Sequence, residues 1–185
     1  MKASSIKIIS AFALLGSLVF ASNAAAQQGP SDANIGAIVL AANQIDIDYG
    51  TIALSKSKNK DVRDFAQQMV TDHNAVQKSV IALAGKLKLT PVDDATSNGL
   101  KSKSVEVKAK LNSLKGKEFD KYYIDNEVEY HKLVCNAVST VLIPNAQNAE
   151  LKSALQGALP LFQGHLEHAQ KIQTTVDASA SHGYK

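Results

Sequence analysis

Apolar residues between Val62 and Leu87 recur alternately four and three residues apart, the pattern of a helix that turns one stripe toward its neighbours. One member of this stripe, near its middle, is not apolar: His73, which directly follows Asp72. The pattern therefore predicts a long amphipathic helix whose buried face carries a histidine. The stripe consists of Val62, Ala66, Met69, His73, Val76, Val80, Leu83 and Leu87.

The same periodicity predicts three further long helices, over about 32–57, 118–143 and 148–176. Asp32 is the expected N-cap of the first, and Asn59 or Asp61 that of the 62–87 helix. The turn between these two helices is very short, which predicts an antiparallel hairpin. The three stripes are Ile35, Ile38, Ala42, Ile45, Tyr49 and Ile52; Ile124, Val128, His131, Cys135, Val138 and Leu142; and Leu151, Leu155, Ala158, Phe162, His165, Ala169, Ile172 and Val176.

A turn-rich segment, 88–99, separates the first pair of helices from the second. It is followed by a shorter lysine-rich helix, 100–114, which we expect to end at Gly116. Four long helices joined by a short, a long and a short connection are typical of a four-helix bundle. The sequence therefore predicts an all-α four-helix bundle with a short extra crossover helix.

The N-terminus has the pattern of a secretory signal peptide. Lys2 and Lys7 precede an uncharged apolar run over 8–20, and Ala24–Ala26 supplies a small-residue cleavage site. We predict a signal peptide over 1–26, a linker over 27–31, the bundle domain over 32–176 and a flexible tail over 177–185. The expected location is the periplasm or the outer membrane, with no transmembrane segment once the signal is removed.

Charge and cysteine content narrow the function classes. Cleavage after Ala26 removes two lysines and leaves 18 basic against 17 acidic residues, which does not favour nucleic acid as a partner. The single Cys135 cannot form an internal disulfide, so packing alone must hold the chain together. The sequence names no partner, and an envelope protein or self-association are the classes left open.

Histidines interrupt three of the four long apolar stripes: His73, His131 and His165. A neutral imidazole without a partner costs roughly 1–3 kcal/mol to bury. A shared metal ion would satisfy all three at once. The alternative is that each ring is hydrogen-bonded separately in the core.

Further metal-ligating residue types lie near these histidines in the helical pattern. They are Asp46 beside the first stripe, Asp72, Glu127 one turn before His131, and His168 one turn after His165. Imidazole with carboxylate suits Zn, Cu, Ni or Fe, and the sequence does not choose among them. Counting residues from the turns leaves two arrangements open, one elongated polar layer or two separate hydrogen-bonded pairs.

The chain resembles the bacterial family called domain of unknown function forty-one forty-two, exported bundles often labelled outer-membrane proteins. The matching residues are Phe65-Ala66-Gln67-Gln68-Met69-Val70-Thr71-Asp72-His73, Phe119-Asp120-Lys121-Tyr122-Tyr123 leading to His131, and Leu159-Pro160 followed by His165-Leu166. The resemblance spans about 32–176. It implies a ferritin-like bundle outside the cytoplasm and brings no established activity.

Two departures bear on metal chemistry. Where the family's first helix usually has glutamates, this chain has Asp46 and Asp48, which reach less far. Di-iron proteins of the wider ferritin-like group use Glu-x-x-His pairs, whereas here Glu127 and His131 are one residue too far apart. We therefore do not expect an oxygen-activating di-iron centre.

Three functions follow from these observations, in order of preference. The first is an exported, non-catalytic bundle whose His-rich core site binds a transition metal. The second is a purely structural or interaction module of the cell envelope with hydrogen-bonded core histidines. The third is a metal-dependent enzyme, which comes last because no nucleophile, acid–base pair or nucleotide motif stands out.

Overall fold

The computed structural model describes residues 29–181, and the side chains of 29–178. The predicted signal peptide 1–26 and the end of the predicted tail, 182–185, lie outside the described residues. Within 29–181 the chain is helical and contains no strand, so the predicted all-α bundle is confirmed. The ferritin-like relationship stays a prediction.

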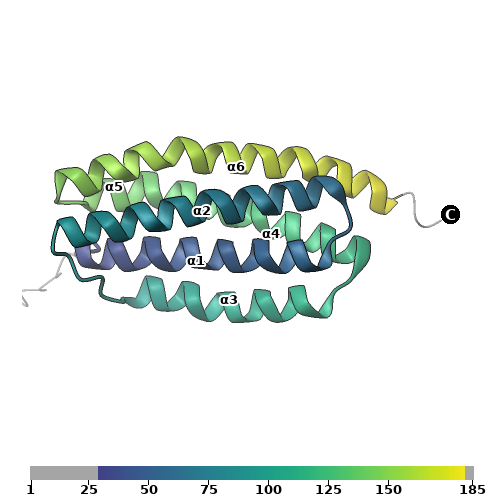
Figure 1. Cartoon of the computed structure of the whole chain (residues 1–185), viewed down its shortest axis with the longest axis horizontal. Helices are drawn as coiled ribbons and strands as arrows, with labels where there is room; N and C mark the ends of the chain where they lie inside the picture. The colour runs from purple at the N-terminus through teal and green to yellow at the C-terminus, as the bar shows by residue number, and fades with distance from the viewer. Residues whose placement is uncertain (1–28, 182–185) are drawn as a thin grey trace, which may run out of the picture.

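Four long helical segments form the bundle, and a fifth lies along its side (Figure 1). The first and last helices run in the same direction, and the second and third long segments run the opposite way. The extra helix packs mainly against the first helix. The elements are α1 (Asp32–Lys56), α2 (Lys60–Lys86), α3 (Ala95–Ser113), α4 (Gly116–Ala137) with its continuations η1 (Val138–Leu142) and α5 (Ile143–Asn145), and α6 (Ala149–Ser181).

Side-chain caps set the start of the first two helices. Ser31, not the predicted Asp32, caps α1, because its hydroxyl accepts from the Asn34 amide while the Asn34 side chain accepts from the Ser31 amide. Asp32 instead accepts from the backbone amides of Gln147 and Asn148, which ties the start of α1 to the start of α6. Asn59, one of the two predicted residues, caps α2.

The crossover differs from the predicted turn-rich segment 88–99. Helix α3 already begins at Ala95, because Asp94 and Ser97 form a reciprocal capping box. Gly99 therefore lies inside a helix. Gly116 does not end α3 but begins α4, with a φ of +57° that favours glycine.

The third long helix widens into a π-helix over Val138–Leu142 before it ends. Pro144 has no amide hydrogen and its ring collides with the carbonyl four residues earlier in an α-helix, and a π turn relieves both problems. The predicted break at Pro144-Asn145 thus comes after Asn145.

The last helix continues to Ser181, so residues 177–181 of the predicted tail are helical. Asp177 pairs with Lys121 of α4, which also pairs with Asp125. These contacts hold the last turns of α6 against the bundle.

The apolar core has two parts, one toward each end of the bundle. The first contains Phe65, Met69, Phe119 and Tyr123, and the second contains Ile35, Leu142, Leu155 and Phe162. Each bundle helix contributes buried polar residues between the two parts: Asn43, Asp46, His73, Glu127, His131 and His165. In the described part of the chain, no helix is long and apolar enough to cross a membrane.

Helices α1 and α2 pack closely at Gly50. A Cβ atom there would lie 2.9 Å from Val70 Cγ2 and 3.0 Å from the Ala66 carbonyl oxygen. Gly164 in α6 is also helical, but a Cβ there would meet nothing within 4 Å. The first glycine is therefore required by packing and the second is not.

We expect Gly50→Ala to lower the free energy of unfolding by about 1–3 kcal/mol, because a backbone oxygen cannot yield to the new methyl group. Gly164→Ala should instead raise it by up to about 1 kcal/mol, since alanine favours a helix. Urea unfolding of both variants measures the difference. Equal effects would contradict a packing role for Gly50.

Candidate metal centre

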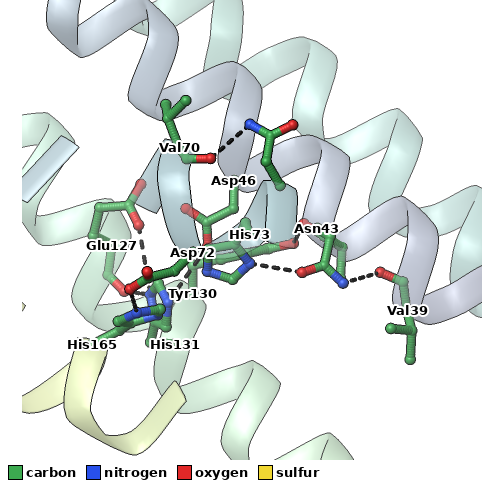
Figure 2. Close-up of polar contacts among 12 residues, drawn as sticks. Val39, Asn43, Asp46, Val70, Asp72, His73, Glu127, Tyr130, His131 and His165 are labelled. Carbon is green, nitrogen blue, oxygen red and sulfur yellow. Dashed lines mark hydrogen bonds and ion pairs between the residues drawn. The ribbon is translucent and has the colours of Figure 1, made fainter. Parts of the chain in front are cut away.

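The buried polar residues converge in the middle of the bundle, and every long helix contributes to them (Figure 2). Helix α1 supplies Asp46, α2 supplies His73, α4 supplies Glu127 and His131, and α6 supplies His165. The Asp46, Glu127, His131 and His165 residues have no exposed surface, and His73 is 3% exposed. The arrangement is one cluster rather than two separate pairs.

His73 is held in one orientation by α1. Its Nδ1 lies 2.8 Å from Asn43 Oδ1, and the Asn43 amide nitrogen donates to the Val39 carbonyl at 2.8 Å. Because the amide oxygen can only accept, Nδ1 of His73 carries the hydrogen in the neutral ring. Its Nε2 therefore presents a lone pair, 3.1 Å from Asp46 Oδ2.

The other two rings are held in the same manner, each from outside the cluster. His131 Nδ1 donates to the Glu127 carbonyl at 3.1 Å, which leaves its Nε2 as a lone pair 3.5 Å from Asp46 Oδ2. His165 Nε2 donates to Asp72 Oδ2 at 2.9 Å, which leaves its Nδ1 as the lone pair.

The three rings can each offer one nitrogen so that the three atoms lie within 4.8 Å of one another. Their centroids are 5.2 to 5.7 Å apart. The nitrogens that have no hydrogen-bond partner among the described residues are His73 Nε2, His131 Nε2 and His165 Nδ1. Metal-binding histidines typically donate their other nitrogen to an outer acceptor in this manner.

Two carboxyl groups share the interior with the rings. Asp46, Glu127 and His131 form a second group whose donor atoms lie within 4.8 Å of one another. While both groups are ionised, none of the four carboxyl oxygens of Asp46 and Glu127 has a hydrogen-bond donor among the described residues. The cluster therefore contains seven buried polar atoms, four oxygens and three nitrogens, that need a proton or an ion. A proton on Asp46 can bond its Oδ2 to His73 Nε2, 3.1 Å away.

Burial disfavours charge throughout this cluster. It raises the pKa of Asp46 to about 8. Burial and the adjacent Asp46 carboxyl raise the pKa of Glu127 well above its ordinary value. Burial and the neighbouring imidazole rings lower the pKa of His73. Burial, and to a smaller extent the His165 ring, lowers the pKa of His131. Without an ion, the cluster is most stable when all its members are neutral.

Two residues that the sequence suggests as metal ligands, His168 and Asp72, lie outside the cluster. His168 Nδ1 lies 2.9 Å from Gln68 Oε1, and its ring edge contacts Phe65, so it is not among the grouped donors. Asp72 bonds His165 from the outer side and is 30% exposed at its side chain. Asp72 is thus a positioning residue for His165.

Counting residues along both helices from the turn near Asn145 puts His131 and His165 at levels about 9 Å apart, yet their ring centroids lie 5.3 Å apart. Such a count includes residues 146–148 as if they were helical, whereas they form the connection before α6. Removing this segment from the count brings the two histidines to nearly the same level.

Sequence reasoning missed Asn43, which orients His73. The signal is a second stripe on α1, Val39, Asn43, Asp46 and Gly50, whose four-three-four spacing places all of them on one buried face. Two polar residues in such a stripe are as informative as a histidine in an apolar one.

A comparison with known protein families agrees with the family resemblance inferred from the sequence. A family model described as Domain of unknown function (DUF4142) matches residues 18–172. The match covers most of the chain, so this protein belongs to that family. Neither the curated proteins nor the solved structures contain a match.

The raised pKa of Asp46 makes the stability of the metal-free protein depend on pH. In the folded state Asp46 keeps its proton up to pH about 8, whereas the unfolded chain loses it near pH 4. The folded state therefore binds more protons, and the free energy of unfolding should fall as pH rises. Between pH 6.5 and 8.5, above the unfolded histidine pKa, we expect Asp46 alone to cause a loss of about 1–2 kcal/mol, to which Glu127 adds.

Urea unfolding of chelator-treated protein across this pH range measures the slope. Asp46→Asn should reduce the slope, because the amide cannot ionise, but should not abolish it, because Glu127 also keeps its proton in the folded state. Asp48→Asn is the matched control, since Asp48 lies near the surface and pairs with Lys108. An unchanged slope in Asp46→Asn would show that Asp46 does not contribute to it.

Proposed function

We propose that this protein is an exported, non-catalytic helical bundle that binds one divalent transition-metal ion in its core. His73, His131 and His165 would supply three ring nitrogens, and Asp46 would supply the carboxylate that faces two of these rings. Glu127 is the nearest additional ligand. The observation that carries the proposal is that three rings, each held by an outer hydrogen bond, can offer nitrogens that lie within 4.8 Å of one another.

The donor set indicates the class of ion. Neutral imidazoles with carboxylates suit Zn, Cu, Ni or Fe in their divalent states. Two ionised carboxylates would balance the charge of such an ion, and the ion would remove the reason for these groups to stay protonated. The partly buried Cys135 is not among the grouped donors of the described residues, so a thiolate site for a soft monovalent ion is not favoured.

The alternative is a structural or interaction module whose histidines are hydrogen-bonded in the core. The outer bonds to Asn43, the Glu127 carbonyl and Asp72 favour it, because they already satisfy half of each ring. It requires protons on Asp46 and Glu127, together with solvent, to satisfy the seven buried polar atoms. Metal binding accounts for these atoms and for their convergence, so we prefer it.

The proposed location is the cell envelope outside the cytoplasm. This rests on the leader pattern of residues 1–26. The proposed role is binding without a reaction, because the described residues of the cluster are all candidate metal ligands and none is a separate nucleophile.

Elemental analysis of protein purified from its native compartment without an affinity tag should find close to one metal ion per chain. Titration of the chelated protein with Zn²⁺, Co²⁺, Ni²⁺, Cu²⁺ and Fe²⁺ should then identify the preferred ion. At a free concentration of one hundred times Kd, the ion should stabilise the fold by about 2.7 kcal/mol.

Ala substitution at His73, His131 or His165 should each weaken binding by at least about 100-fold, since each removes a direct ligand. His168→Ala is the matched control, because this histidine lies one turn beyond His165 and bonds Gln68 instead. Unchanged affinity in the three variants, or no stoichiometric metal in any preparation, would leave the structural alternative.

A further inference from the structure

A groove runs between α2 and α6 and is separate from the cluster of candidate metal ligands. It encloses about 440 Å³, which is within the ~300–1,000 Å³ range of small-molecule sites. Small residues, including Ala75, Ser79, Ala154 and Gly157, leave the space open, and Val80 and Leu83 give it apolar walls. The groove explains why the second half of the α2 stripe, although apolar, is only partly buried.

One end of the groove reaches the region beside the histidines. Phe162 lines it and stacks on His73, with ring centroids 5.6 Å apart and an interplanar angle of 7°. Asp72 also lines it, and one of its oxygens accepts from His165. Of the residues that line the groove, Asp72 is the one that carries a charge.

The lining limits the chemistry of a ligand. Its side chains are apolar except for Asp72 and Ser79, so sugars, nucleotides and other ligands with many polar groups would lose hydrogen bonds on entering. A negative ligand would approach the Asp72 carboxylate. A hydrocarbon body gains about 0.8 kcal/mol for each CH₂ group that it buries.

We propose that this groove binds a small cationic amphiphile, a primary amine with a hydrocarbon body, whose ammonium group contacts Asp72. The body lies along the apolar walls between α2 and α6. The carboxylate has two oxygens, so one can accept from the ammonium group while the other keeps His165 in place. The proposal does not depend on metal binding, because neither Asp72 nor any residue of the groove walls is a ligand in the proposed metal site.

The probe is n-octylamine, which is cationic at pH 7, as the lysine amine is. Calorimetric titration of the chelated protein and of the metal-supplemented protein, below the concentration at which the amine aggregates, should show one saturable site in both. Octan-1-ol should bind at least about tenfold more weakly, because it lacks the charge, and octanoate should not bind.

Two kinds of variant separate the parts of the site. Asp72→Asn keeps an oxygen for His165 but removes the charge, so octylamine should bind about tenfold more weakly while octanol is unchanged. Gly157→Leu places a side chain in open space at the groove and should abolish binding of both. Gly164→Leu is the matched control, because it also enters open space on α6 but does not line the groove.

Circular dichroism and melting temperature establish that each variant is folded. If Gly157→Leu does not fold, Ser79→Leu blocks the groove from α2 instead. Absence of saturable octylamine binding, equal binding of octanoate, or equal loss in Gly164→Leu and Gly157→Leu would overturn the proposal. A dimer that Gly157→Leu dissociates would overturn it in favour of a second copy of this chain.

Discussion

The structure depends on the cost of placing ionisable groups in the middle of an apolar bundle. Three imidazoles and two carboxyls lie with almost no exposed surface between two apolar cores. A buried charge without a partner costs several kcal/mol or shifts its pKa until it is neutral. The raised pKa of Asp46 and the lowered pKa of His73 are the second of these responses.

Outer hydrogen bonds make the layer specific. Each histidine donates one ring nitrogen to a fixed acceptor, and the acceptors come from a side chain on α1, the backbone of α4 and a side chain on α2. A ring that is fixed on one side presents the other nitrogen in one direction, so the inner three meet. A bound ion would require rings fixed in this manner, so the preorganisation supports the proposed metal site. The charge and groove position of Asp72 then link this layer to the surface.

Much of the site could be predicted from residue patterns, although not its assembly. His73, His131 and His165 stand out because each interrupts an apolar stripe, and Asp46 and Glu127 lie beside such stripes. His168 also lies close to a stripe, one turn after His165. Its ring bonds Gln68 instead, because it lies on a neighbouring face of α6. Asn43 was overlooked because asparagine is common on exposed helix faces, and only its place in a second buried stripe reveals it. The groove could not be predicted, since it arises where small residues of two distant segments face each other.

By itself the sequence determined the number and approximate limits of the long helices, their amphipathic faces, the short hairpin between α1 and α2, and the histidines on the buried stripes. Helical periodicity and turn chemistry are local properties, so they can be read from one chain. Only the tertiary structure decided that the polar residues form one cluster, which nitrogen of each ring makes the outer hydrogen bond, and that α4 continues into a π-helix shortly before Pro144. These outcomes depend on the relative height and rotation of packed helices, and packing between segments far apart in the chain sets both.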